Sequence, residues 1–333
     1  MVLSGGESSE RDVSLRSGEA VAEALRSAAL GEIWYGHVET AVLEEDGSWT
    51  WRGERQSELT ALQALRRERD TTVFVALHGG RGEDGRIQAL LESAQVRYTG
   101  SGPAASSLCM DKRAARGVLV DEGLRVPPAQ LVSQLPAGAD SRARLQQALT
   151  ELSGEEAGWF VKPNLGGSSA GIQRVQSADG LLAAVSLILE LGDRALVEAA
   201  ILGTELSVGV LGIEGVDLRA LPPVEIRPRS AGWFDAVEKY DAERGAIEVC
   251  PPQSVSPKVD ERLREQALRA HTATGCRCYS RTDFIVTAED EIVALEVNTL
   301  PGLTARSLLP LEALCAGMDF ESLCLEILRL AGP

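Results

Sequence analysis

The chain has 333 residues and a formal net charge of −16 at pH 7. This length is enough for two or three domains with cores of their own. The acidic balance argues against a nucleic-acid-binding surface, which needs a basic stripe. No apolar run reaches the roughly 18 residues that cross a membrane, and the first residues lack the pattern of a secretory signal. We expect a cytoplasmic protein with neither nucleic-acid nor membrane partners.

The elements expected in the first hundred residues are those of an α/β fold. A short strand ends at Gly5-Gly6, and a helical pattern follows over 13–25. The apolar run 73–77 is typical of a buried parallel strand. It is followed by a helix around 87–93 and a short strand at 96–99. This alternation predicts an open, doubly wound sheet with ligands at the strand ends.

Beyond residue 103 the expected elements are mixed. We expect helices at 104–122, 140–152, 178–191, 258–275 and 319–330. We expect strands at 159–162, 195–201, 205–212, 220–226, 283–287 and 291–297. The stretch 227–257 contains four prolines and many polar residues, which predicts a long loop. Loops of that length in compact domains are often functional lids.

The cysteines and histidines form no metal or redox motif. Six cysteines are scattered along the chain, and Cys276 and Cys278 are spaced too closely for a CxxC pair. The histidines, His37, His78 and His271, show no zinc-binding pattern. We expect reduced thiols, as in cytosolic proteins.

The lysines carry more information, because the chain has only four of them against 29 arginines. Lysine is a compact point charge that can approach a phosphate group, whereas arginine is a broad planar fork. Three of the four, Lys112, Lys162 and Lys239, lie in segments that other features mark as functional. The alternative is chance in a GC-biased genome.

A predicted hairpin near the C-terminus gathers three oxygen ligands beside one arginine. Side chains two apart on a strand share a face, so Glu296 and Asn298 point the same way. A tight turn near 289–290 places Asp283 opposite Glu296 and close to Arg281. Carboxylate and amide oxygens suit Mg²⁺, which shares its shell with water and phosphates. The pattern indicates a metal-nucleotide site; the alternative is two surface acids on an edge hairpin.

Two glycine-rich turns in the N-terminal part have structural and functional interpretations. Residues 80–85 match GxGxxG, but no acid follows the next strand as a nicotinamide site requires, so that signal is weak. His78 is either a ligand contact or a satisfied buried histidine. In the turn at 5–10, Ser8 or Ser9 could cap the following helix. Glu10 is then either a first-turn acid or a ligand for a substrate ammonium.

A second lysine and two acids mark a possible nucleotide pocket. Lys162 ends a strand and precedes a loop at 163–171 rich in glycine and serine, which could close over phosphates; a plain hairpin loop is the alternative. Glu198 lies in an otherwise apolar strand, so its carboxylate needs a partner such as an adenine amino group. Glu205 could reach a ribose. Singly, each acid could also be a partly exposed strand residue.

Together these segments resemble the ATP-grasp superfamily and, within it, the D-alanine–D-alanine ligases, over nearly the whole chain. The segments that carry the resemblance are 5–14, 78–85, 98–102, 110–112, 162–169, 238–240, 281–283, 296–302 and 307–308. The resemblance implies an N-terminal parallel-sheet domain over 1–102, then a two-subdomain ATP-grasp fold over 103–194 and 195–333. The lid loop falls at about 227–257.

The resemblance also implies roles for individual residues, with ATP and two Mg²⁺ ions (or Mn²⁺) as cofactors and D-alanine as substrate. ATP phosphates would contact Lys112, Lys162, Ser168 and Lys239. The adenine would contact Glu198 and the backbone near Ile201, and the ribose Glu205. The metal ligands would be Asp283, Glu296 and Asn298.

The remaining implied roles concern the two D-alanine molecules and the chemistry. Glu10, with His78 nearby, would hold the first ammonium, and Ser307 and Leu308 the second carboxylate. Arg281 and the Gly302 amide would form the oxyanion site. Hydrogen bonds among Ser168, Tyr240 and Glu10 would link lid, loop and N-terminal domain. The family is commonly a homodimer.

The sequence departs from the family pattern at the lid, where Ala236 replaces a usual tyrosine, and at Ala199, where a charged residue is frequent. The first strand is also short. A D-alanine–D-lactate ligase is the main alternative, although Tyr240 favours the amine-using form by resemblance. Another ATP-grasp carboxylate–amine ligase and a non-catalytic ATP-binding regulator are further alternatives.

Overall fold

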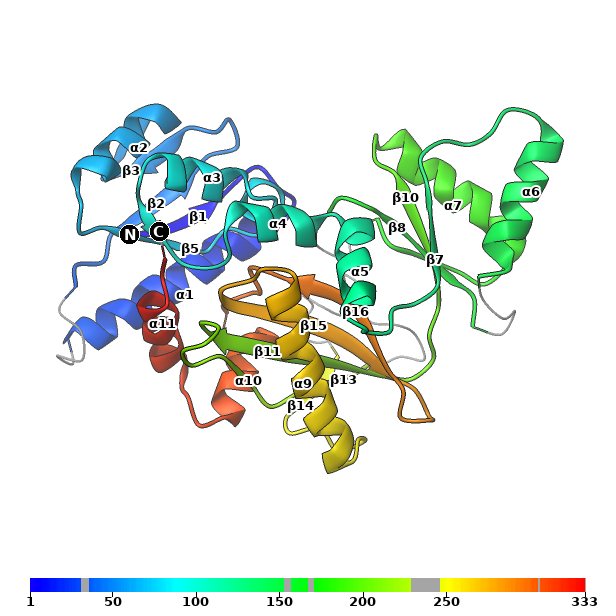
Figure 1. The fold of residues 1–333 in the computed structure, drawn as a ribbon. Coiled ribbons are helices and arrows are strands. Elements are labelled where there is room, and N and C mark those ends of the chain that lie inside the picture. Colours follow the sequence, from blue (N-terminus) through cyan, green and yellow to red (C-terminus); the bar gives the residue numbers. More distant parts are fainter. Residues whose placement is uncertain (31–35, 153–156, 167–170, 229–245, 305, 333) are drawn as a thin grey trace.

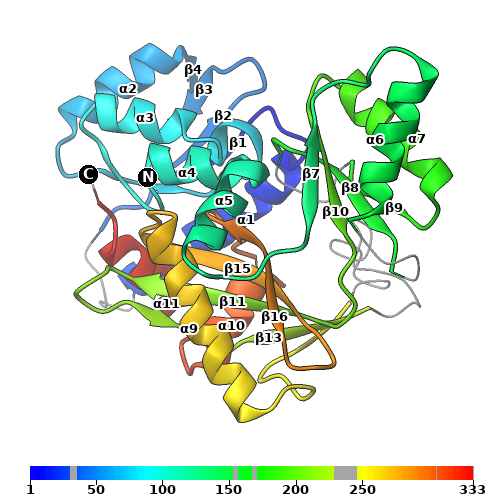
Figure 2. The same ribbon diagram turned by 45° about the vertical axis from the view of Figure 1, so that its right-hand side comes forward.

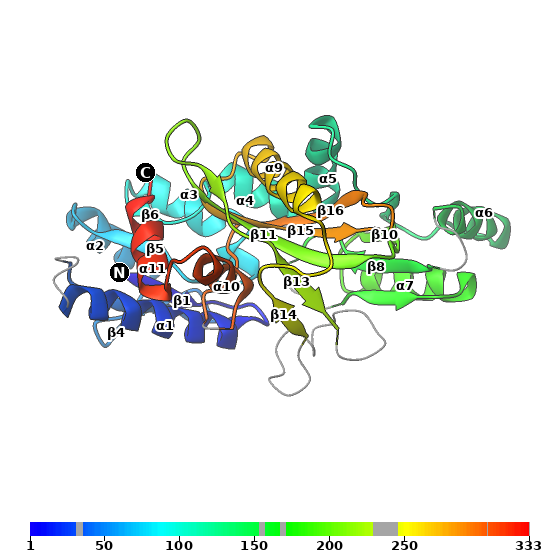
Figure 3. The same cartoon turned by 90° about the horizontal axis from the view of Figure 1, so that it is seen from below.

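The structure is a computed structural model that describes residues 1–333 except 31–35, 153–156, 167–170, 229–245, 305 and 333. Three sheets organise the described residues. The N-terminal and central sheets lie at opposite ends of the molecule, with the C-terminal sheet between them (Figures 1 and 3). In the part of the chain that is described, none of the helices combines the length and apolar character needed to span a bilayer.

The N-terminal sheet has the strand order β4-β3-β2-β1-β5-β6. Its strands are β1 (Val2–Gly5), β2 (Thr40–Leu43), β3 (Trp49–Trp51), β4 (Glu54–Gln56), β5 (Thr72–Val75) and β6 (Arg97–Tyr98). The expected parallel arrangement is confirmed for β2, β1, β5 and β6. The sequence analysis missed the strands β2 to β4; β3 and β4 form an antiparallel edge. Each of these strands spans only three or four residues, too few to show a clear alternation.

Helices alternate with these strands along the chain and cover the sheet. They are α1 (Arg11–Leu30), α2 (Glu58–Arg67), the 3₁₀ turn η1 (Gly80–Gly82) and α3 (Arg86–Ser93). Helix α1 extends further at both ends than the pattern over 13–25 predicts, because its buried stripe continues to Ala28. The last helix of the chain, α11 (Phe320–Arg329), packs against α1, so the two ends of the chain share one core (Figure 1).

The central sheet is antiparallel, in the order β7-β10-β8-β9. Its strands are β7 (Ala129–Val132), β8 (Trp159–Pro163), β9 (Gln173–Val175) and β10 (Ala195–Ala199). Helices α6 (Ala139–Thr150) and α7 (Ala178–Glu190) pack together beside it, away from the rest of the molecule (Figure 2). A separate apolar cluster fills the space between helices and sheet.

Two helices connect the N-terminal part to this sheet, where the sequence predicted one over 104–122. Helix α4 (Pro103–Met110) ends and α5 (Lys112–Asp121) begins at Asp111. The backbone of Asp111 is extended, and its carboxylate accepts a hydrogen bond from the Ala114 amide. This N-cap geometry starts a new helix and explains the break.

The C-terminal sheet has the order β14-β13-β11-β15-β16, with β12 paired to β11. Its strands are β11 (Thr204–Gly212), β12 (Arg219–Ala220), β13 (Val224–Arg227), β14 (Ile247–Val249), β15 (Cys278–Val286) and β16 (Ile292–Asn298). The prediction of a continuous loop over 227–257 is wrong in one part, because β14 pairs with β13 there. Residues 229–245 of that loop lie outside the described residues.

The two faces of this sheet differ in character. Leu206, Val208 and Val210 of β11 pack with helix α9 (Pro257–Ala273) in an apolar core. Ser207 and Gly209 alternate with them and therefore point to the opposite face. Helix α10 (Leu308–Cys315) lies on that second face and contacts β11. The second face carries the polar residues of the candidate site.

Candidate active site

The hairpin of β15 and β16 places the four expected residues on one face. Arg281 pairs in register with Asn298, and Asp283 with Glu296, which confirms the predicted pairing. A β-bulge follows between Asp283 and Phe284. Nε and Nη2 of Arg281 each donate a hydrogen bond of 2.8 Å to one oxygen of Asp283. The result is a buried bidentate ion pair, the strong form of arginine–carboxylate contact.

The electrostatic environment keeps Arg281 firmly charged. Burial alone would lower the pKa of its guanidinium, but the carboxylates of Asp283, Glu312 and Glu296 outweigh burial and raise that pKa. Opposite charges within a few ångströms favour the ionised form in this way. Arg281 is therefore a permanent cation in a site that also contains several acidic side chains.

The oxygen donors of this face fit a hard divalent cation in kind. Asp283 and Glu296 supply carboxylates, and Asn298 supplies an amide whose Oδ1 accepts a hydrogen bond of 3.0 Å from the Leu300 amide. Such donors suit Mg²⁺ or Mn²⁺ sharing its shell with phosphates. Within the described ranges, no group of three or more His, Cys, Asp or Glu side chains is placed to hold a metal by itself.

A pocket of about 430 Å³ lies between the central and C-terminal sheets. Its wall includes residues of both sheets and of α10. Eight residues singled out from the sequence line it: Lys162, Glu198, Ile201, Glu205, Arg281, Asp283, Glu296 and Leu308. The structure thus brings these eight residues together from segments more than a hundred residues apart, whereas Lys112 and Asn298 do not line the pocket.

Glu198 is buried in this pocket between two cations. Its Oε2 lies 2.6 Å from Nζ of Lys162, and its Oε1 accepts a hydrogen bond of 2.8 Å from Arg116. The carboxylate thus has protein partners where the sequence suggested an adenine amino group. Arg116 was not predicted from the sequence. It could have been recognised as an arginine on the buried face of α5, which also contains Ala115 and Leu119.

Lys112 stands at the first turn of α5 and reaches the loop after β8. Its Nζ donates a hydrogen bond to the carbonyl of Gly166. Burial lowers the pKa of Lys112. Asn164 fixes the start of the helix, since its Oδ1 accepts from the Arg113 amide at 3.0 Å and its Nδ2 donates to Asp111 at 2.9 Å. Lys112 is thereby held beside the glycine-rich loop.

Three expected site residues, Ser168, Lys239 and Tyr240, lie outside the described residues, as does Ala236 of the lid. Their placement is therefore untested.

The N-terminal candidates, Glu10 and His78, lie together at the ends of β1 and β5. An ideal Cβ on Gly79 would be 2.8 Å from Oε2 of Glu10, so the carboxylate lies directly against this glycine. His78 is buried, and its Nε2 lies 2.9 Å from Oγ of Ser17. Its Nδ1 is 3.9 Å from Glu83. The structure therefore gives His78 the partners of a satisfied buried histidine, next to Glu10.

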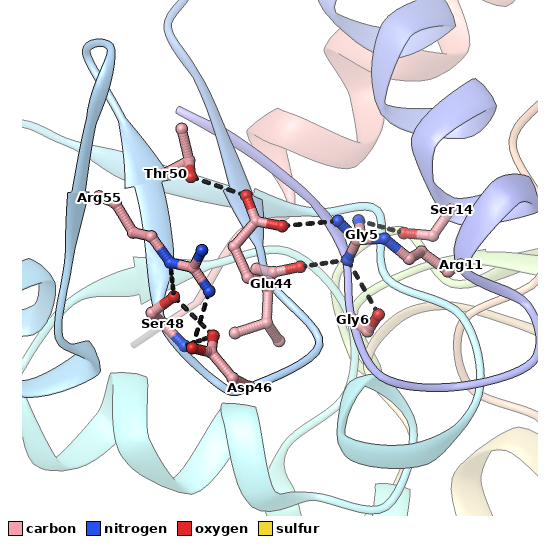
Figure 4. Close-up of polar contacts among 10 residues, drawn as sticks. Gly5, Gly6, Arg11, Ser14, Glu44, Asp46, Ser48, Thr50 and Arg55 are labelled. Carbon is pink, nitrogen blue, oxygen red and sulfur yellow. Dashed lines mark hydrogen bonds and ion pairs between the residues drawn. The ribbon is translucent and has the colours of Figure 1, made fainter.

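The glycine turn before Glu10 is anchored by Arg11, the first residue of α1 (Figure 4). Nη1 of Arg11 donates to the carbonyls of Gly6 at 3.0 Å and Leu43 at 2.7 Å, and Nη2 lies 2.7 Å from Glu44. Ser14 accepts a hydrogen bond of 2.8 Å from the Gly5 amide. These contacts fix the turn against β2, and with it the start of α1 next to Glu10.

Gly302 and Ser307 meet at the start of α10. An ideal Cβ on Gly302 would lie 2.7 Å from Oγ of Ser307. That oxygen also accepts a hydrogen bond of 3.1 Å from the Thr304 amide. Leu308 follows and is 6% exposed, with part of its side chain in the pocket wall.

Sequence reasoning also missed Glu312, which is fully buried in α10. The signal was a single carboxylate in the otherwise apolar run Leu308–Cys315. Burial raises the pKa of Glu312 to about 8.

Comparison with known proteins agrees with this geometry. Residues 1–101 match the family description "D-ala D-ala ligase N-terminus", and residues 119–329 match "D-ala D-ala ligase C-terminus". The chain is 40% identical over 330 residues to a D-alanine–D-alanine ligase of Oleidesulfovibrio alaskensis, covering 99% of this chain and 95% of the relative. It is 39% identical over 328 residues to one of Geobacter sulfurreducens, covering 98% and 92%.

Two solved structures have the same fold. The VanG D-Ala:D-Ser ligase from Enterococcus faecalis superposes with a TM-score of 0.81 at 28% identity, covering 99% of this chain and 98% of that one. The D-alanine–D-alanine ligase from Coxiella burnetii gives 0.79 at 25% identity, covering 99% and 92%. With both family regions matched and relatives aligned over more than nine-tenths of their length, the chain belongs to the D-alanine–D-alanine ligase family.

Proposed function

We propose that this protein is an ATP-dependent ligase that joins two D-alanine molecules into D-alanyl-D-alanine for peptidoglycan precursor synthesis. The observation that carries the proposal is the single pocket that holds Lys162 and Glu198 beside Arg281, Asp283 and Glu296. The pocket thereby combines cationic side chains that could contact phosphates with oxygen donors that could bind a metal ion. Relatives that are similar over 99% of this chain are named D-alanine–D-alanine ligases.

ATP would bind in the pocket between the two sheets. Lys112 and Lys162 would contact its phosphates, together with Ser168 and Lys239. Glu198 and the backbone near Ile201 would contact the adenine, and Glu205 the ribose. The support is the position of Lys162 and Glu198 in the pocket wall, with Ile201 and Glu205 beside them.

Asp283, Glu296 and Asn298 would hold two Mg²⁺ ions, or Mn²⁺, at the phosphate end. Bound there, the ions would supply charge neutralisation for the transferring phosphoryl group. The bidentate contact with Arg281 now occupies both oxygens of Asp283. Ligation would therefore require Asp283 to share or exchange that contact.

The chemistry follows from the weakness of a carboxylate as an acylating group. Transfer of the γ-phosphoryl group to the first D-alanine gives a D-alanyl phosphate, and the amine of the second D-alanine then displaces phosphate. Arg281 and the Gly302 amide would stabilise the developing oxyanion, an effect worth roughly 3–4 kcal/mol per donor. Exclusion of water protects the acyl phosphate from hydrolysis.

The two D-alanine molecules would bind at the edge of the N-terminal domain. Glu10, with His78 nearby, would hold the ammonium of the first. Ser307 and Leu308 would bind the carboxylate of the second. Glu10, Ser168 and Tyr240 would link the N-terminal domain to the loop and lid. We also propose a cytoplasmic homodimer, as is common in the family.

A different second substrate is the main alternative. The similar VanG protein is a D-Ala:D-Ser ligase. D-Lactate, the hydroxy acid that corresponds to D-alanine, is another candidate for the second substrate. Another carboxylate–amine pair would use the same pocket. The D-serine and D-lactate alternatives share the first half of the reaction and differ only in the nucleophile, whereas another carboxylate–amine pair would also change the acyl phosphate.

The proposal is tested by measuring phosphate release by the purified protein with Mg²⁺-ATP and D-alanine. Parallel reactions contain L-alanine, or D-alanine with D-lactate or D-serine. We expect release that depends on D-alanine and yields D-alanyl-D-alanine. Turnover with a different acid or amine would reassign the substrate, and a folded protein that binds ATP without turnover would favour the regulator.

A further inference from the structure

We propose that Glu312 is a positioning residue for Arg281: the polar end of its side chain reaches from α10 across β11 and keeps the guanidinium on the active-site face. The inference deepens the proposed function, because it concerns the arginine placed at the oxyanion.

The first observation is a close approach over a glycine. Gly209 of β11 is the register partner of Arg281 on β15. An ideal Cβ on Gly209 would lie 2.3 Å from Oε2 of Glu312 and 2.5 Å from Cδ1 of Leu309. A side chain at 209 would therefore collide with the carboxyl group. Directly opposed residues in an antiparallel pair lie roughly 4.5–5.5 Å apart between Cα atoms, so the carboxyl group of Glu312 lies next to the strand position from which Arg281 projects.

The second observation is that this carboxyl group is buried without ordinary hydrogen bonds. Glu312 is fully buried. Neither of its oxygens makes a hydrogen bond to the described residues, and the same holds for Oγ of Ser207, two residues before Gly209. Ser207 and the backbone of Gly209 nonetheless act to lower the pKa of Glu312, against the effect of burial. A buried polar group with so little local compensation is costly, so its presence needs a reason.

The third observation is electrostatic. Burial raises the pKa of Glu312 to about 8, while Arg281 acts in the opposite direction as the largest favourable charge. Arg281 in turn has Glu312 among the carboxylates that raise its own pKa, after Asp283. The two side chains interact in both directions. A carboxyl group with this pKa is mostly protonated at pH 7, so Glu312 acts on Arg281 chiefly as a neutral polar group.

The functional consequence follows from the position of Asp283. Asp283 lies two residues after Arg281 on β15, and its two oxygens accept hydrogen bonds from the Arg281 guanidinium. If Asp283 turns to a metal ion, Arg281 loses part of that support. Glu312 would remain as an anchor on the β11 side. It does not line the pocket, so it would act through Arg281 and not on the nucleotide.

Two substitutions of similar size separate a positioning role from a packing role. Glu312→Leu removes the polar end, and Glu312→Gln keeps a polar end of the same shape. Because burying an apolar side chain in place of a poorly paired carboxyl group is favourable, a pure packing role predicts a stable and fully active Leu variant. The positioning role predicts a stable Leu variant with impaired turnover.

We expect Glu312→Leu to have a melting temperature at or above that of the wild type and to lose kcat by roughly 10- to 100-fold, because small displacements of a catalytic group have effects of this size. The KM for ATP should stay within about 3-fold of the wild-type value, because the substitution removes no contact to the bound nucleotide. Glu312→Gln should restore most of kcat. The matched control is Glu261→Leu, an exposed glutamate of α9 on the other face of the same sheet. It should change neither quantity.

A thermal double-mutant cycle with Arg281→Met tests the contact without any substrate. Removing Arg281 takes away the largest favourable charge that acts on Glu312. At pH 9, where this carboxyl group is mostly ionised, Glu312→Leu should therefore raise the melting temperature more in the Arg281→Met background than in the wild type. We expect a difference of roughly 2 °C or more, which is the size of a contact coupling in a chain of this length. If Glu312→Leu fails to fold, Glu312→Met takes its place.

Additive melting temperatures, or a Leu variant with wild-type kcat, would overturn the inference. The cycle also separates this inference from the proposed function. If the protein did not ligate D-alanine, the thermal coupling would still be present; if the coupling were absent, D-alanine ligation could still be intact.

Discussion

The ammonium nitrogen of Lys162 lies 2.6 Å from Oε2 of Glu198, and both side chains are more than nine-tenths buried. Glu198 also holds Arg116 through its other oxygen at 2.8 Å. The cluster has two positive charges and one negative charge, so it has one cation in excess. That excess makes the pocket attractive to the phosphates of a nucleotide.

The two partners of this ion pair should therefore respond differently to substitution. Lys162→Met leaves Glu198 paired with Arg116, so folding should change little, while ATP affinity should fall by roughly 10- to 100-fold with the loss of one charge-assisted contact. Glu198→Gln leaves two buried cations without their carboxylate and should cost roughly 3–5 kcal/mol of stability. Calorimetric ATP titration and thermal unfolding measure the two effects.

The control for this pair is Lys258→Met, at an exposed lysine of α9. It should alter neither ATP affinity nor the melting temperature. An unchanged ATP affinity in Lys162→Met would remove Lys162 from the nucleotide site.

Arg281→Ala should separate turnover from nucleotide binding. Loss of an oxyanion donor typically lowers kcat by roughly 10²- to 10³-fold. The variant also leaves Asp283 buried without its bidentate partner, so some thermal stability should be lost as well. The measurement is phosphate release at saturating ATP, paired with an equilibrium ATP dissociation constant. Turnover near that of the wild type would refute the assigned role.

The sequence predicted the hairpin because its information is local. Alternation along β15 and β16 and a tight turn near 289–290 predict that Asp283 faces Glu296, and the structure confirms this pairing. The β-bulge was not predicted: residues 284–286 pair with 294–292, one position off the register expected from that turn. The partners of Glu198 could not be predicted in the same way. Arg116 is 82 residues away, and only the packing of α5 against the central sheet brings the two together.

Two further parts of the site show the same limit. Glu312 was visible as one acid in an apolar helix, but its position over Gly209 depends on how α10 docks on β11. The roles of Ser168, Lys239 and Tyr240 stay predictions, since these residues lie outside the described ranges. The domain boundaries at 102 and 194 also stay predictions.

The pH dependence of stability should include a contribution from Glu225 in β13. Burial alone would raise its pKa, but hydrogen bonds from Arg227, at 2.6 Å, and from the amides of Gln253 and Ser254 lower it to about 2. A carboxyl group with a lowered folded-state pKa stabilises the fold above its unfolded value near 4.5, and the contribution is lost as the pH falls towards 2.

Glu225→Gln should therefore lower the free energy of unfolding at pH 7 by on the order of 2 kcal/mol, and by progressively less between pH 4.5 and pH 2. Urea unfolding at a series of pH values measures this difference. A deficit that stays constant down to the lowest accessible pH would mean that packing, not ionisation, accounts for the effect.

His271 should contribute to the pH dependence of stability over a different pH range. It is buried in α9 with Nδ1 2.7 Å from Oγ of Ser280, and burial lowers its pKa to about 4 from 6.5. Between these values the unfolded chain binds a proton that the folded protein does not. Stability should therefore fall as the pH drops from 6.5 to 4, by up to about 3 kcal/mol.

Replacing His271 by Gln should remove this component and flatten the stability profile between pH 6.5 and pH 4. His37, whose side chain is 84% exposed, provides the matched control. The substitution His37→Gln should leave the slope unchanged. An identical slope in the wild type and in His271→Gln would show that the buried histidine does not titrate in this window.

Gly302→Ala tests the contact between the two residues placed around the second substrate. A Cβ at this position would lie 2.7 Å from Oγ of Ser307 and would push that hydroxyl away from its present position. If Ser307 binds the second D-alanine, the KM for that substrate should rise by roughly 10-fold while the KM for ATP is unchanged. Gly117→Ala is the control, because a Cβ there meets no atom within 4 Å.

The same substitution in a Ser307→Ala background decides which group is responsible. If alanine at 302 acts by displacing the Ser307 hydroxyl, the double variant should be no worse than Ser307→Ala alone, because the two changes remove one interaction. If kcat falls further in the double variant, alanine at 302 disturbs the Gly302 amide itself. That result would support the oxyanion role of the amide and would separate it from the binding role of Ser307.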